Sequence, residues 1–246
     1  MIARPHMHTI CIAGTDRTGI MSRMKVSLLI PTRNEEGCIG RVLAEVPRKL
    51  IDEIVIVDGH STDKTMEEAR AHLQSTDQLL TQNGKGFGNA MIEALQAADG
   101  DILLIMDADG SHNPADIPAI LEKIHAGYEY VMGSRYMKGA HSLDDTVIRR
   151  FGNHMFTWLI NVLYGTRVTD ALYLYTAITR EGYNKLTLTS QGFEFCTEIL
   201  IKAHRAGLKF AEVPAIERSR FAGETKVNAF WHGLKILRMI LKQYWE

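Results

Sequence analysis

The segment Ile102-Leu-Leu-Ile-Met-Asp-Ala-Asp109 holds the strongest structural signal in this 246-residue chain, because a short apolar run leads directly into two carboxylates. A run of this length, 102–106, is typical of a strand that is covered on both faces. Ligands of open α/β sheets bind just beyond the carboxyl ends of the strands. We therefore predict that Asp107 and Asp109 lie at the functional edge of a parallel sheet.

Strand-like and helix-like segments alternate along the chain. We predict strands at 26–30, 54–57, 78–81, 102–106 and 130–133. Helices are predicted at 35–50, 61–73 and 87–98, and a further helix follows the 107–109 segment and ends at about 126. The second half has helices at 154–164, 193–206 and about 228–244, and β-rich segments at 173–179 and 208–213. This order predicts βαβ units. We expect one α/β domain over 24–246, with a Rossmann-like, mostly parallel sheet and helices on both faces, after an N-terminal extension, 1–23, of unassigned role.

The composition excludes several classes of protein. The chain is 46% hydrophobic and 23% charged, which is typical of a globular protein and argues against disorder. Its net charge of -1 gives no support for a nucleic-acid partner. Cys11, Cys38 and Cys196 lie far apart, which favours reduced thiols over a zinc site. With no signal-peptide pattern in 1–23, we expect a cytoplasmic protein.

The two carboxylates after the 102–106 strand suit a metal ion. Unneutralised, Asp107 and Asp109 would repel each other, and a hard cation such as Mg²⁺ or Mn²⁺ removes this repulsion and completes its shell with phosphate oxygens. The alternative is a solvated, Asp-rich turn.

Four further segments follow predicted strands or carry phosphate-binding residue types. Asp58 ends the 54–57 strand and would accept hydrogen bonds from a nucleotide base, unless it only ends the strand. The glycine-rich segment 83–88, with Lys85, suits a close approach to phosphate, or forms a plain turn. Arg135 follows the 130–133 strand, and the basic segment 218–226 suits phosphate recognition or a solvated surface.

Five motifs occur together in a fixed order: Pro31-Thr-Arg-Asn-Glu35, Val57-Asp-Gly-His-Ser-Thr-Asp63, Met106-Asp-Ala-Asp-Gly-Ser-His112, Gly133-Ser-Arg-Tyr136 and Arg220-Phe-Ala-Gly-Glu-Thr-Lys226. From about residue 24 to 240 the chain resembles family 2 glycosyltransferases of GT-A fold, in particular the polyprenyl (dolichyl) phosphate sugar synthases.

This resemblance implies an inverting hexosyltransferase that uses Mg²⁺ or Mn²⁺ and moves a sugar from a UDP- or GDP-linked donor to a polyprenyl phosphate. It implies metal binding by Asp107 and Asp109, and catalytic roles for Asp107, Asp109, Arg135 and Asp170. The residues expected to bind the nucleotide sugar are Pro31, Thr32, Glu35, Asp58, Lys85, Asp107 and Ala108, and those expected to bind the acceptor phosphate are Arg135, Arg149, Arg218, Arg220 and Lys226.

The sequence departs from the family pattern at three places. Gly59 stands where the family frequently has a second Asp, so the sequence does not decide which nucleotide base the donor carries. Ser111 replaces a common Gln, so water or His112 would complete the metal shell. The segment 170–176 lacks the usual Gly and Arg, which leaves the acceptor open. A glycosyltransferase acting on a small soluble hydroxyl compound, with Asp170 or Glu194 as base, and a nucleotidyltransferase are the alternatives.

The last predicted helix is amphipathic. Phe230, Leu234, Leu237, Leu241 and Trp245 follow helical spacing, and Lys235, Arg238 and Lys242 lie on another side. This face would either lie on an anionic membrane surface or pack against the core. We expect peripheral contact with the cytoplasmic face of a membrane and leave a homo-oligomer open.

Overall fold

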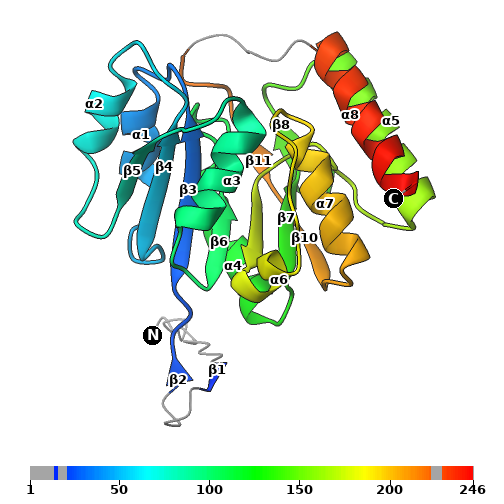
Figure 1. Ribbon diagram of the computed structural model, residues 1–246, viewed down its shortest axis with the longest axis horizontal. Helices are drawn as coiled ribbons and strands as arrows, with labels where there is room; N and C mark the ends of the chain where they lie inside the picture. The colour runs from blue at the N-terminus through cyan, green and yellow to red at the C-terminus, as the bar shows by residue number, and fades with distance from the viewer. Residues whose placement is uncertain (1–13, 16–20, 223–228, 246) are drawn as a thin grey trace, which may run out of the picture.

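The structure is a computed structural model that describes residues 14–15, 21–222 and 229–245. Its centre is a seven-stranded sheet of order β10-β7-β9-β6-β3-β4-β5, in which β9 is antiparallel to both of its neighbours and the other neighbouring pairs are parallel (Figure 1). The strands are β3 (Val26–Thr32), β4 (Glu53–Asp58), β5 (Gln78–Thr81), β6 (Ile102–Ile105), β7 (Tyr130–Ser134), β9 (Thr176–Thr179) and β10 (Phe210–Pro214).

Helices cover both faces of this sheet, as the sequence predicts. One apolar core lies under α3, α5, α7 and α8, and a second core lies under α1 and α4 on the opposite face. The helices are α1 (Ile39–Glu45), α2 (Thr65–Arg70), α3 (Phe87–Ala97), η1 (Pro114–Asp116), α4 (Ile117–His125), α5 (Val147–Tyr164), α6 (Arg180–Asn184), α7 (Phe195–Arg205) and α8 (Ala229–Trp245). Among the described residues, no helix is both long and apolar enough to cross a membrane.

Strand β3 runs further than the apolar pattern predicts, through Pro31 to Thr32. Leu29 accepts a hydrogen bond from Met106 on the β6 side, and Thr32 accepts one from Gly59 on the β4 side. Because hydrogen-bonding direction alternates along a strand, Pro31 faces the β6 side, where the register with β6 has already ended at Leu29. The missing N–H of proline therefore breaks no ladder bond.

Two short ladders complete the topology. Strand β1 (Gly14–Thr15) pairs antiparallel with β2 (Met21–Ser22). Strand β8 (His141–Ser142) pairs parallel with β11 (Ile216–Glu217), which ties the loop after β7 to the segment after β10. This second ladder brings 217–220 to the carboxyl edge of the central sheet.

Some predicted boundaries are wrong. Helix α1 covers only 39–45 of the predicted 35–50, because Val46 precedes Pro47 and is extended. Helix α2 covers only 65–70 of the predicted 61–73, and its N-cap is Lys64. Helix α5 begins at Val147 instead of 154, with the Thr146 side chain accepting from the backbone of Arg149.

Candidate active site

Two neighbouring clefts open at the carboxyl edge of the sheet. Cleft 1, about 310 Å³, lies beyond β3, β4 and β6 and at the start of α3. Cleft 2, about 260 Å³, lies between the loops after β6 and β7 and the helices α5 and α8. Four residues line both clefts, namely Phe87, Asp107, Phe193 and Arg220. A molecule in one cleft would therefore meet a molecule in the other at Asp107 and Arg220.

Cleft 1 gathers most of the residues predicted to bind a nucleotide sugar. Its walls include Pro31, Thr32, Glu35, Asp107, Ala108 and Asp109. Gly86 and Phe87 at the start of α3 also line it, so the positive end of the helix dipole faces the cleft. This arrangement suits an anionic group such as a diphosphate.

Asp58 and Lys85 are not among the residues that line cleft 1. Asp58 is 2% exposed, and its two carboxylate oxygens accept from the backbone and the hydroxyl of Ser61. The Ser61 hydroxyl oxygen in turn accepts from the backbone of Asn34. Asp58 thus holds the loop that forms one wall of the cleft. Lys85 is exposed at the glycine-rich turn.

His112 packs beside the carboxylate pair and is neutral. Burial lowers its pKa to about 3, and its ring stacks on Tyr175 and meets Tyr173 edge to face. Its Nδ1 accepts from the backbone N–H of Asp107 at 3.1 Å, so the proton lies on Nε2, 3.6 Å from Oδ2 of Asp107. Neither ring nitrogen offers a lone pair to a metal. The alternative in which His112 completes a metal shell is therefore not supported.

The carboxylates of Asp107 and Asp109 fit a hard divalent cation. Burial and the charge of Asp109 raise the pKa of Asp107 to about 8, because the nearby guanidinium of Arg220 offsets the repulsion between the two carboxylates only in part. Within the described residues, no group of three His, Cys, Asp or Glu side chains is placed to hold a metal ion. Water and substrate phosphate would supply the remaining ligands, which is the usual arrangement for Mg²⁺.

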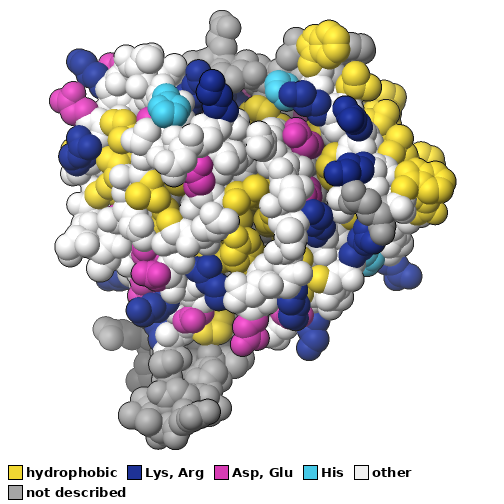
Figure 2. Space-filling model, in the orientation of Figure 1, with side chains coloured by type: hydrophobic (Ala, Val, Ile, Leu, Met, Phe, Trp, Pro, Cys, Tyr) yellow, Lys and Arg dark blue, Asp and Glu magenta, His cyan; other side chains and the backbone are white. Residues whose placement is uncertain are grey.

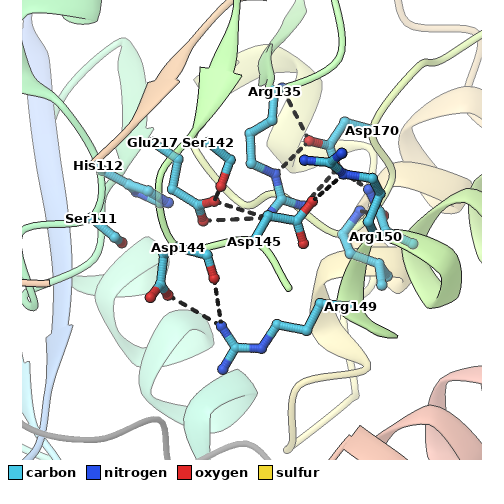
Figure 3. A network of polar contacts seen from close by, with 12 residues as sticks. Ser111, His112, Arg135, Ser142, Asp144, Asp145, Arg149, Arg150, Asp170 and Glu217 are labelled. Carbon is cyan, nitrogen blue, oxygen red and sulfur yellow. Dashed lines mark hydrogen bonds and ion pairs between the residues drawn. The ribbon is translucent and has the colours of Figure 1, made fainter. Parts of the chain in front are cut away.

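Arg135 is fixed in a buried ion-pair network at cleft 2 (Figure 3). Its Nε and Nη2 donate to the two oxygens of Asp170, at 2.7 and 3.0 Å, and Nη1 donates to Glu217 at 3.2 Å. Asp170 is fully buried and also accepts from Asn153. With both oxygens occupied and no place on either cleft wall, Asp170 is a counter-ion that positions Arg135. Its geometry does not support the predicted role as a general base.

The other predicted phosphate-binding arginines differ in position. Arg149 lines cleft 2 and donates to Asp144 at 3.2 Å, and Arg220 lines both clefts. Arg218 lines neither, because it donates to Glu45 and to the backbone oxygens of Gly110 and His112. Lys226 lies outside the described residues.

Cleft 2 also contains residues that the sequence analysis missed. Four carboxylates face its three arginines in the described lining, and Tyr173 lies with its ring 4.7 Å from the Arg135 guanidinium. The rings of Phe87 and Phe193 stack at 4.8 Å and form the partition between the clefts, and His232 of α8 meets Phe193 edge to face. These residues come from distant parts of the chain, so no local pattern marks them. The missed carboxylates are Asp144, Asp145 and Glu217.

Comparison with known proteins gives the class. A family model for "Glycosyl transferase family 2" matches residues 27–193, and the chain belongs to this family. The chain is 34% identical to a dolichyl-phosphate hexose transferase of Haloferax volcanii, over 88% of this chain and 92% of that protein. It is 31% identical to a dolichol-phosphate mannosyltransferase of Pyrococcus furiosus, over 83% of this chain but only 60% of that protein.

Solved structures show the same fold. A crystal structure of glucosyl-3-phosphoglycerate synthase from Mycobacterium tuberculosis, in complex with Mn²⁺, UDP-glucose and phosphoglyceric acid, matches with a TM-score of 0.75. The match covers 90% of this chain and 80% of that one, at 21% identity. The predicted GT-A architecture, a single α/β domain with a mostly parallel sheet, is thereby confirmed.

Proposed function

We propose that this glycosyltransferase moves a hexose from a UDP- or GDP-linked sugar in cleft 1 to a polyprenyl phosphate in cleft 2. The observation that carries the proposal is the shared wall of the two clefts, where Asp107 and Arg220 face both. Holding donor and acceptor on either side of one wall aligns them for in-line displacement at the anomeric carbon, with inversion. The names of the two relatives above support the acceptor class.

The donor diphosphate would lie between the carboxylate pair and the start of α3. Asp107 and Asp109 would hold Mg²⁺ or Mn²⁺, which neutralises charge on the leaving diphosphate when bound. The loop of Pro31, Thr32 and Glu35 would carry the nucleoside, and Asp58 would act by keeping the neighbouring loop in place through Ser61. The helix dipole of α3 adds positive potential at the same point.

A phosphate acceptor agrees with the chemistry of cleft 2. A phosphate monoester is already an anion and needs no strong general base, which fits the occupied carboxylate of Asp170. Arg135, Arg149 and Arg220 supply forked donors around it. Because each of these arginines already pairs with a carboxylate, the acceptor would bind by exchanging partners with Asp144 or Glu217.

The polyprenyl chain has an apolar path. Ile148, Phe156 and Ile236 line cleft 2 where it opens between α5 and α8. In Figure 2, hydrophobic side chains gather along the edge that Figure 1 assigns to these two helices, next to Lys and Arg side chains. The exposed apolar residues there are Val147, Ile148, Phe151, Met155, Trp158 and Val162 of α5 and Trp231, Leu234, Leu241, Tyr244 and Trp245 of α8.

Helix α8 combines the two alternatives predicted for it. Ile236, Met239 and Ile240 pack into the core, while Leu234, Leu241 and Trp245 face outward. The side chain of Phe230 is outside the described residues. Lys235, Arg238 and Lys242 are exposed on the same helix. We infer that α5 and α8 lie on an anionic membrane at its cytoplasmic face, where the acceptor headgroup reaches cleft 2.

The second candidate is a soluble acceptor. The charged floor of cleft 2 would equally hold a small phosphorylated acid, and the Mycobacterium tuberculosis structure contains phosphoglyceric acid. Membership of a glycosyltransferase family argues against a nucleotidyltransferase.

One experiment separates these candidates. The full chain is incubated with Mn²⁺, a panel of UDP- and GDP-sugars, and one of three acceptors: a short isoprenyl phosphate, the matching isoprenol or phosphoglyceric acid. Mass spectrometry of the products should show a sugar mass added to the isoprenyl phosphate but not to the isoprenol. Equal use of the alcohol, or reaction with phosphoglyceric acid alone, would transfer the assignment to a soluble or hydroxyl acceptor.

A further inference from the structure

Arg220 stands between the two clefts and contacts a carboxylate of each. Its Nη1 lies 3.0 Å from Oδ2 of Asp109, and its Nε lies 3.5 Å from Oδ2 of Asp144. The guanidinium side chain is 25% exposed, whereas that of Asp109 is 8% exposed. Arg220 therefore supplies the positive charge at a carboxylate that the proposed function assigns to a divalent cation.

A guanidinium and a divalent cation compete for the same oxygen of Asp109. We propose that Arg220 is an internal counter-ion that pairs with Asp109 until metal binds. The guanidinium then leaves Asp109 and pairs with Asp144 in cleft 2. The proposal rests on the proposed function, because it takes Asp107 and Asp109 as metal ligands. It assigns to Arg220 a role in coupling the clefts that differs from simple phosphate binding.

The position of Asp144 lowers the free-energy cost of this exchange. Arg220 already contacts it, so the guanidinium keeps a carboxylate partner when it leaves Asp109. Arg149 also donates to Asp144, at 3.2 Å. Once Arg220 no longer pairs with Asp109, Asp144 would be the carboxylate partner of both arginines, and the surplus positive charge would favour an anion in cleft 2. Since coupling between sites is reciprocal, an anionic acceptor would in turn favour metal in cleft 1.

The test measures Mn²⁺ binding by the full chain without nucleotide, using electron paramagnetic resonance of free Mn²⁺. The Arg220→Gln variant should bind Mn²⁺ at least about fivefold more tightly than the wild type, the low end of usual site-to-site coupling. Arg149→Gln is the matched control, because it removes a cation from Asp144 without touching Asp109, and it should change the affinity less than twofold. Equal or weaker binding by Arg220→Gln would overturn the proposal.

A double-variant cycle distinguishes direct competition from general electrostatics. Asp144→Asn removes the second partner of Arg220, so Arg220 should hold Asp109 more firmly and Mn²⁺ affinity should fall. In the Arg220→Gln background the same change should have no effect, whereas a general field effect would persist there. Circular dichroism checks that each variant is folded. If neither the wild type nor Arg220→Gln binds Mn²⁺, the metal site of the proposed function fails as well; if both bind equally, only the counter-ion role fails.

Discussion

Arg135 and Asp170 meet edge to edge through two hydrogen bonds, of 2.7 and 3.0 Å, although 35 residues separate them in the sequence. The backbone N–H of Arg135 donates to the same carboxylate, which also accepts from Asn153. This pairing fixes the plane of the guanidinium and leaves Nη1 toward Glu217. Cleft 2 is therefore built on a buried ion pair.

Replacement of Asp170 by Asn should destabilise the protein strongly. It leaves a buried guanidinium with one partner fewer, and breaking a buried pair in this way costs about 3–5 kcal/mol. Urea denaturation at pH 4 measures the loss, and Asp107→Asn, at a partly exposed position, is the control and should keep the stability of the wild type at that pH. An Asp170→Asn variant of normal stability that has lost turnover would return Asp170 to the chemistry as a general base.

The free energy of unfolding should depend on pH in a way that reveals the raised pKa of Asp107. The pKa of Asp107 is raised from 3.8 to about 8, so between these values the folded protein binds a proton that the unfolded chain releases. Without metal, the free energy of unfolding should thus fall as pH rises from about 4 to 8. Asp107→Asn removes this loss and should be more stable than the wild type at pH 8, by roughly 1–2 kcal/mol because water partly screens the exposed carboxyl group.

Two controls accompany this measurement. At pH 4 the wild type and Asp107→Asn should have similar melting temperatures, because the carboxyl group is then protonated in the folded protein. At pH 8, Mn²⁺ should raise the melting temperature of the wild type by mass action but have little effect on the variant. A difference between the two proteins that stays constant from pH 4 to pH 8 would contradict the raised pKa.

The position of cleft 1 can be predicted from the sequence, because its walls are formed by residues at the ends of strands. Runs such as 54–57 and 102–106 are buried on both faces, so their apolar composition predicts β4 and β6 directly. The residues just after parallel strands then share one edge, which places Asp107 beside the end of β3. Local sequence is sufficient for this part of the site.

The arrangement of cleft 2 does not follow from local sequence. Arg135 finds its partners 35 and 82 residues away, at Asp170 and Glu217, and such pairings leave no periodic signal. Helix α5 is a second case. Its first turns expose Val147 and Phe151, at 85% and 70%, beside the exposed Arg150, so apolar and polar residues do not separate onto two faces as they do in a typical surface helix. The predicted start at 154 is wrong for this reason.

Gly88 allows α3 to approach the loop before α7. A Cβ at this position would lie 2.3 Å from the backbone oxygen of Ser190, and the N–H of Gly88 donates to Gln191 at 2.9 Å. Gly88→Ala should destabilise the protein by about 1–3 kcal/mol. It should also weaken binding of a nucleoside diphosphate, because Gly86 and Phe87 of the cleft 1 wall would shift with the helix. Calorimetry with UDP and GDP measures this second effect.

The matched control is Gly152→Ala in α5, where a Cβ would meet no atom within 4 Å. An alanine in a helix interior should stabilise the protein by about 0.5–1 kcal/mol. Normal nucleotide affinity of a destabilised Gly88→Ala protein would mean that the contact of α3 with the loop serves the fold and not the cleft.

The outward stripe of α5 should carry much of the membrane affinity. Val147, Phe151, Met155, Trp158 and Val162 recur at helical spacing and are each at least 43% exposed. Burial of a large apolar side chain contributes about 1.5–3 kcal/mol. The double variant Phe151→Ser, Trp158→Ser should therefore bind anionic vesicles at least about tenfold more weakly in co-sedimentation, with an unchanged melting temperature because neither side chain packs in the core. Neutral vesicles should bind the wild type more weakly, since Lys235 and Arg238 add electrostatic attraction. Unchanged vesicle binding of the double variant would contradict this prediction. If, in addition, analytical ultracentrifugation shows that the wild type is a dimer and the double variant a monomer, the stripe is an interface between two copies of the chain.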